Sequence, residues 1–181
     1  MVGHLFLISA AVFGTVGVGA ISVYHLGPYL WGFWIHGITR RGPTFSRKVA
    51  LTFDDGPDPS STLRCLEILN PHQVRATFFL VGERVRRHPE LARAIRAQGH
   101  DVGNHTWGHR HHWLLSPRQA HAEVREGARA ITEVIGEPPR LFRPPFGQMN
   151  VFSFREAVRL GERCVLGSIA VMDWRPGLSP D

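Results

Sequence analysis

The chain has 181 residues, of which 43% are hydrophobic and 20% are charged, and this balance excludes an intrinsically disordered protein. The formal charge of +6 does not indicate a nucleic-acid surface. Residues 1–48 carry four basic side chains and no acidic one, which leaves 17 basic and 15 acidic residues from position 49 onward. We therefore expect one globular domain with an N-terminal appendage and no nucleic-acid partner.

Residues 5–24 contain no charged side chain, and 20 helical residues span about the ~30 Å of a bilayer core. No Lys or Arg precedes them, so an uncleaved membrane anchor is favoured over a signal peptide, which stays the alternative. Residues 26–38 follow as an aromatic, interfacial stretch that includes Tyr29, Trp31 and Trp34. We assign residues 1–46 to anchor, aromatic stretch and basic linker, and 47–181 to the domain.

From residue 47 onward, apolar runs of strand length alternate with segments of helical period. The strands are expected at 49–53, 76–81, 101–104, 141–143 and 164–172. The helices are expected at 60–70, 83–98, 117–135 and 152–161. This alternation predicts an α/β fold with a parallel sheet or barrel, and because five strands do not close a barrel, we expect the domain to be incomplete at its C-terminal end.

Polar clusters follow four of these strands. They are Asp-Asp at 54–55, His-Thr-Trp-Gly-His at 105–109, Arg-Pro-Pro-Phe-Gly at 143–147 and Asp-Trp at 173–174. The carboxyl ends of parallel strands share one edge of the sheet, where substrates bind in this class of fold. The four clusters are therefore expected to converge on one site.

The first two clusters indicate a metal site. Asp54 and Asp55 are too close for both to ionise easily without a cation, although a turn that caps the next helix is the alternative. His105 and His109 are four residues apart and, with Asp55, would form a His₂Asp site with open positions. Because Thr106 stands where a helical His-Glu-x-x-His site has its base, the base must come from elsewhere, and Asp54 is adjacent.

The first cluster belongs to the longer segment Thr-Phe-Asp-Asp-Gly-Pro at 52–57. In this order, the segments at 52–57, 105–109 and 143–147 resemble the first three signature motifs of the polysaccharide deacetylase family, the NodB-homology domain of carbohydrate esterase family 4. Asp173-Trp174 is similar to the fourth motif. The resemblance covers about residues 47–175. It implies a distorted (β/α) barrel with fewer than eight strands, and metal-dependent removal of N-acetyl, or less commonly O-acetyl, groups from glycans.

The resemblance also implies roles for single residues. Asp55, His105 and His109 would bind a divalent metal, for which Zn²⁺ suits the ligands best and Co²⁺ or Ni²⁺ are alternatives. Asp54 would be the general base that takes a proton from water.

The remaining residues are implied in support of this centre. Arg143 would orient Asp54, and the backbone N–H of Phe146 would stabilise the oxyanion. Trp174 would line the acetyl pocket, unless it is an ordinary core residue. Asp173 would hold the general-acid His of a fifth motif, Leu-x-His, which does not follow in this sequence, so we expect slow turnover and an incomplete enzyme.

We therefore expect a membrane-anchored deacetylase of an acetylated polysaccharide such as peptidoglycan or a chitin-like polymer. The location of such polymers places the domain outside the cytoplasm, against the orientation that Arg40 and Arg41 favour. Two alternatives remain: deacylation of a lipid-linked sugar at the membrane, and an inactive glycan-binding remnant.

Overall fold

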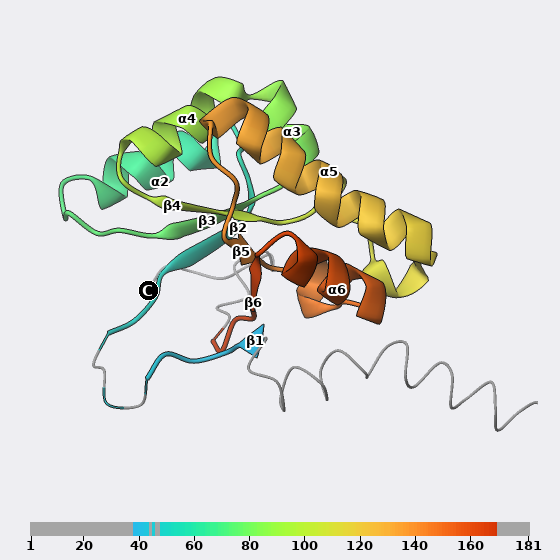
Figure 1. Cartoon of the computed structure of the whole chain (residues 1–181). Helices are drawn as coiled ribbons and strands as arrows, with labels where there is room; N and C mark the ends of the chain where they lie inside the picture. The colour runs from blue at the N-terminus through green and yellow to red at the C-terminus, as the bar shows by residue number, and fades with distance from the viewer. Residues whose placement is uncertain (1–37, 44, 46–47, 170–181) are drawn as a thin grey trace, which may run out of the picture.

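The computed structural model of the chain describes residues 38–43, 45 and 48–169 (Figure 1). They form a six-stranded sheet in the order β1-β6-β5-β4-β3-β2, in which every neighbouring pair is parallel. Its strands are β1 (Ile38–Thr39), β2 (Thr52–Gly56), β3 (Thr77–Leu80), β4 (Asp101–Asn104), β5 (Leu141–Phe142) and β6 (Arg163–Val165). The expected parallel α/β fold is thus confirmed.

Helices connect these strands as the alternation predicts. They are α2 (Ser61–Leu69), α3 (Gly82–Arg87), α4 (Pro89–Ala97), α5 (Pro117–Ile135) and α6 (Val151–Arg159), with 3₁₀ turns η1 (His112–Leu114) and η2 (Pro145–Gly147). Figure 1 shows α2 to α5 together on one side of the sheet and α6 near β5 and β6. Helix α5 has its predicted bounds, because Ser116 and Gln119 form a capping box and Gly136 ends it at φ 88°.

Three predicted elements differ from the structure. The helix expected at 83–98 is two helices that meet at His88 (φ −133°, ψ 60°), because Pro89 has no N–H and disfavours helical backbone before it. The first strand includes Asp54 and Asp55 rather than ending before them. The last strand ends at Val165, well short of the predicted 164–172, of which 170–172 lie outside the described residues.

Strand β1 was not expected, because Ile38 and Thr39 belong to stretches that we assigned to the interfacial segment and the linker. They pair in parallel with Cys164 and Val165 of β6. The expected span at 5–24 lies outside the described residues, and among the residues that are described no helix is long and apolar enough to cross a bilayer.

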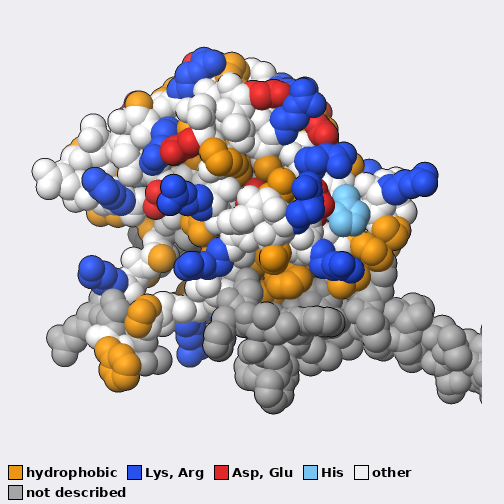
Figure 2. Space-filling view, viewed as in Figure 1, with side chains coloured by type: hydrophobic (Ala, Val, Ile, Leu, Met, Phe, Trp, Pro, Cys, Tyr) orange, Lys and Arg blue, Asp and Glu red, His pale blue; other side chains and the backbone are white. Residues whose placement is uncertain are grey.

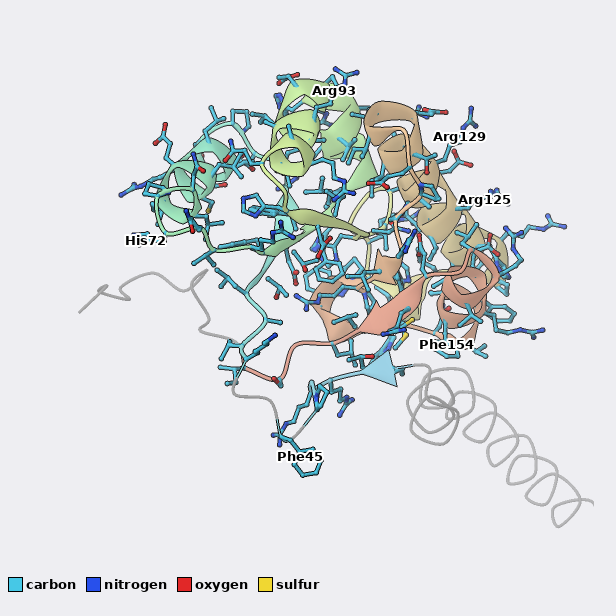
Figure 3. All side chains as sticks on the ribbon, turned by 60° about the vertical axis from the view of Figure 1, so that its left-hand side comes forward. Phe45, His72, Arg93, Arg125, Arg129 and Phe154 are labelled. Atoms are coloured by element: carbon cyan, nitrogen blue, oxygen red, sulfur yellow. The ribbon has the colours of Figure 1, made fainter. Side chains whose placement is uncertain are left out.

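The core consists of two apolar clusters. The larger one lies between the sheet and α2 to α5 and includes Leu66, Phe78, Leu80, Val85, Ile95 and Ile131. The smaller one joins α5, α6, β5 and β6 through Val124, Phe142, Met149, Ala157 and Cys164. Ile38 of β1 and Phe154 of α6 pack against this second cluster, and Figure 3 shows Phe154 at that end of the molecule. Each large side chain buried in this way contributes roughly 1.5–3 kcal/mol.

Two glycines allow α3 and α5 to approach the segment that follows β4. A Cβ on Gly127 would lie 2.4 Å from Oδ1 of Asn104 and 2.6 Å from the carbonyl carbon of Thr106. A Cβ on Gly82 would lie 2.9 Å from Cα of Gly127 and from Trp107. Both helices therefore press directly on residues 104–107, where the His-Thr-Trp-Gly-His segment at 105–109 begins.

Basic side chains predominate on the face shown in Figure 2, with acidic ones among them. Ion pairs link neighbouring parts of the domain: Arg86 of α3 pairs with Glu133 of α5 at 3.2 Å, and Arg96 of α4 pairs with Glu137, which follows α5, at 2.5 Å. Arg93, Arg125 and Arg129 extend away from the helices in Figure 3. Such exposed pairs contribute little to stability, so the core and not the surface holds the fold.

Candidate active site

The end of β2 sends two successive carboxylates to different partners. The pairing of β2 with β3 shifts register between Phe53 and Gly56, and Asp55 has a φ of 64°. Asp54 accepts a hydrogen bond of 2.7 Å from Nη1 of Arg143. Asp55 Oδ1 instead lies 3.3 Å from Nε2 of His105 and 2.8 Å from Nε2 of His109. The irregular strand end thus gives each acid its own environment.

The structure brings the three predicted ligands together. The ligand atoms of Asp55, His105 and His109 all lie within 4.8 Å of one another. His105 is buried, His109 is half-buried and Asp55 is exposed, so one side of the group faces solvent. The contact with His105 first, and then that with His109, holds the pKa of Asp55 well below its usual range.

The protonation of His105 fits a metal. Its Nδ1 lies 2.6 Å from the carbonyl oxygen of Arg143, which is only an acceptor, so the proton resides on Nδ1. Nε2 then presents a lone pair to the Asp55 carboxylate, which is also an acceptor. Two facing acceptors need a cation or a proton between them. A ring N–H that donates to a backbone carbonyl commonly fixes the orientation of a metal-binding His.

Arg143 clamps the other carboxylate. Besides Asp54, its Nη1 donates to Oγ1 of Thr52 at 2.8 Å and its Nε to the carbonyl of Val165 at 3.3 Å. The guanidinium carbon lies 4.1 Å from the ring centre of Phe79. Because Arg143 is only 7% exposed, the guanidinium is fixed in place and orients the Asp54 carboxylate.

An aromatic pair borders the metal ligands. Phe146, with a φ of 57°, is half exposed; its ring stacks on His111 at 3.8 Å and meets His109 edge-on at 4.8 Å. No sequence pattern distinguishes His111 from the other histidines, of which the chain has 11 in all. Its neighbour His112 is buried against Ser153, and burial lowers the pKa of His112 to about 4.

A buried polar network supports the segment before His105, and the sequence did not indicate it. Asn104 donates from Nδ2 to Glu162 at 3.0 Å and to the carbonyl of Val124 at 2.9 Å, and its Oδ1 accepts the N–H of Thr106 at 2.9 Å. Burial raises the pKa of Glu162 to about 8. Glu162 lies after the end of α6 and belongs to no periodic pattern. Its contact with Asn104 is therefore seen only in the folded structure.

Left-handed backbone at non-glycine residues is concentrated here: Asp55, Thr106, His109 and Phe146 have φ between 53° and 71°. Such conformations are costly and cluster at functional sites. The two other predicted site residues, Asp173 and Trp174, lie outside the described residues.

A parallel α/β sheet that gathers two histidines, two aspartates and a buried arginine at its strand ends defines a protein with a candidate metal centre. Comparison with known families then identifies it. The family model described as "Polysaccharide deacetylase" matches residues 41–165, and the chain belongs to this family.

Curated relatives share much of the domain. The chain is 37% identical over 131 residues to a peptidoglycan-N-acetylglucosamine deacetylase of Bacillus cereus, covering 72% of this chain and 61% of that protein. It is 39% identical over 135 residues to a chitooligosaccharide deacetylase of a Bradyrhizobium species, covering 74% and 62%. The chain thus spans about three-fifths of the length of these relatives.

The fold is also similar to solved structures. A family 4 carbohydrate esterase from Bacillus anthracis matches with a TM-score of 0.72 at 27% identity, covering 81% of this chain and 72% of that one. The parallel sheet described above is therefore the sheet of this family of esterases.

Proposed function

We propose that the chain is a metal-dependent hydrolase that removes acetyl groups from an N-acetylglucosamine-containing polysaccharide. The observation that carries the proposal is the separation of two adjacent carboxylates: Asp55 joins His105 and His109, whereas Asp54 is held apart by Arg143. One acid is thus available to bind a metal and the other to accept a proton.

In this reaction a water oxygen bonds to the acetyl carbon, the bond from that carbon to nitrogen breaks, and the nitrogen takes up a proton that balances the one the water loses, so the products are acetate and a free amine. Asp54 accepts the proton of the attacking water, and the hydrogen bond from Arg143 orients the Asp54 carboxylate. The backbone N–H of Phe146 is the expected donor to the oxyanion. A divalent ion held by Asp55, His105 and His109 would supply Lewis-acid polarisation and acidify the water.

The proposal also extends to the metal, the substrate and the placement of the chain. Two His nitrogens and one carboxylate suit Zn²⁺, and also Co²⁺ or Ni²⁺. The names of the relatives favour N-acetyl groups of peptidoglycan or chitin-like oligomers. The same relationship supports a distorted (β/α) barrel, in which Asp173 would hold a general-acid His and Trp174 would line the acetyl pocket. The apolar segment at 5–24 supports a membrane anchor, with the domain on the side where such polymers lie.

The test uses the full chain, stripped of metal and then supplied with Zn²⁺, Co²⁺ or Ni²⁺. Chitooligosaccharides and peptidoglycan are the substrates, and acetate and new free amines are counted. We expect metal-dependent release of equal amounts of both. Glycan binding without acetate release, whichever metal is supplied, would contradict the proposal and favour a glycan-binding protein. Acetate release from a lipid-linked amino sugar alone would instead favour deacylation of a lipid-linked sugar at the membrane.

A further inference from the structure

The first turn of α3 lies between the two segments that carry the metal ligands. Just before it, the N–H of Val81 donates to the carbonyl of Gly56 at 2.8 Å. The N–H groups of Gly82 and Glu83 donate to the carbonyls of Thr106 and Trp107 at 2.8 and 3.0 Å. One short helix therefore holds the Asp55 segment on one side and the His105–His109 segment on the other.

One side chain of this helix reaches a ligand residue directly. Nη1 of Arg84 donates a hydrogen bond to the backbone carbonyl of Asp55. Asp55 has left-handed backbone, a conformation that costs free energy unless its surroundings hold it. Because the orientation of this peptide unit sets the direction of the carboxylate, the Arg84 contact bears on whether Asp55 faces His105 and His109.

We propose that Arg84 is a positioning residue of the metal centre, which fixes the backbone of Asp55 so that its carboxylate meets the two histidines. This inference rests on the proposed metal site. Arg84 is exposed and acts through Asp55 rather than on the substrate.

Positioning and simple electrostatics predict opposite effects of replacing Arg84 on metal affinity. A guanidinium close to a bound dication repels it, so removing the positive charge of Arg84 would by itself tighten metal binding. Loss of the hydrogen bond that positions Asp55 would weaken metal binding. The sign of the change in metal affinity therefore separates the two explanations.

The experiment measures the Kd of the full, metal-stripped chain for Zn²⁺ against a competing chelator. Arg84→Met keeps the apolar stem and removes every donor, and we expect about 10-fold weaker binding or more, as for loss of other outer supports of metal ligands. Arg84→Lys restores one donor and should lie between this variant and wild type. The matched control is Arg87→Met, because Arg87 is exposed on the same helix and, within the described part of the chain, its ion pair is with Glu83, so its loss should leave affinity nearly unchanged.

Wild-type or tighter affinity in Arg84→Met would overturn the proposal, and so would an equal loss in Arg87→Met. If Arg84→Met fails to fold, as judged by thermal unfolding without metal, Arg84→Lys decides: a several-fold loss is expected and wild-type affinity would overturn the inference. A wild-type chain that takes up no Zn²⁺ would overturn the metal site itself, and this inference with it.

Discussion

The carbonyl oxygen of Arg143 accepts a 2.6 Å hydrogen bond from Nδ1 of His105. The side chain of the same arginine extends to Asp54, so one residue connects the metal-ligand group to the candidate base. The two connections are chemically separable, since one uses the backbone and the other the guanidinium.

Arg143→Lys is therefore expected to impair turnover more than metal binding. The lysine keeps the carbonyl that supports His105 but loses the fork that holds Asp54 and Thr52. We expect kcat for acetate release to fall by up to about 10²-fold, the lower part of the range for general acid–base catalysis. The metal content of the purified variant, measured by mass spectrometry, should match wild type. Equal loss of metal and turnover would show that the guanidinium instead holds the metal site together.

Gly127→Ala is expected to destabilise the domain by about 1–3 kcal/mol, because its methyl group would overlap Asn104 and Thr106. Thermal unfolding measures this loss. Gly42→Ala is the matched control, since a Cβ there meets no atom within 4 Å. A Gly127→Ala chain as stable as the control variant would mean that α5 does not press on the ligand segment.

The stability of the domain should depend on pH through Glu162. Burial raises the pKa of Glu162 to about 8, from 4.5 in the unfolded chain. Between these values the folded state keeps a proton that the unfolded state has released. Stability is therefore lost as pH rises through this window, and the loss is complete above about pH 8.

Glu162→Gln keeps the acceptor for Asn104 and removes the titration. Urea unfolding at pH 5 and pH 8.5 should show similar stabilities at the lower pH and a more stable variant, by a few kcal/mol, at the higher. A difference that does not change with pH would contradict the buried, protonated Glu162.

The stack of His111 on Phe146 should influence substrate turnover. Aromatic pairs contribute about 0.5–1.5 kcal/mol, so loss of the stack in His111→Ala should lower kcat/KM by up to about tenfold. His111→Phe restores a flat ring and should recover most of the loss. Identical kcat/KM in the alanine variant and wild type would show that the stack does not order the residues around Phe146.

The parallel sheet and the meeting of Asp55, His105 and His109 could be predicted because both depend on simple patterns. Strands that alternate with helices run parallel, and polar residues at their carboxyl ends meet at one edge. The division of the helix expected at 83–98 could also have been predicted from Pro89. The helical period continues across Pro89, and for that reason we expected a single helix.

Other features depend on contacts that no local pattern carries. The left-handed backbone of Thr106 is imposed by neighbouring segments, since a β-branched side chain disfavours this conformation. The contacts of Arg84 with Asp55, and of Glu162 with Asn104, join residues 29 and 58 positions apart. Strand β1 has only two residues, too few for any periodicity.

The central claim is that Asp55 and Asp54 have different functions, and the metal content of matched variants tests it most directly. Full-length wild type, Asp54→Asn and Asp55→Asn would each be stripped, titrated with Co²⁺ and followed by absorption, with bound metal counted per chain. We predict about one ion in wild type and in Asp54→Asn, which should retain no measurable acetate release, and strongly weakened binding in Asp55→Asn, as loss of one of three protein ligands demands. Full occupancy in Asp55→Asn, or loss of the ion in Asp54→Asn alone, would contradict the account.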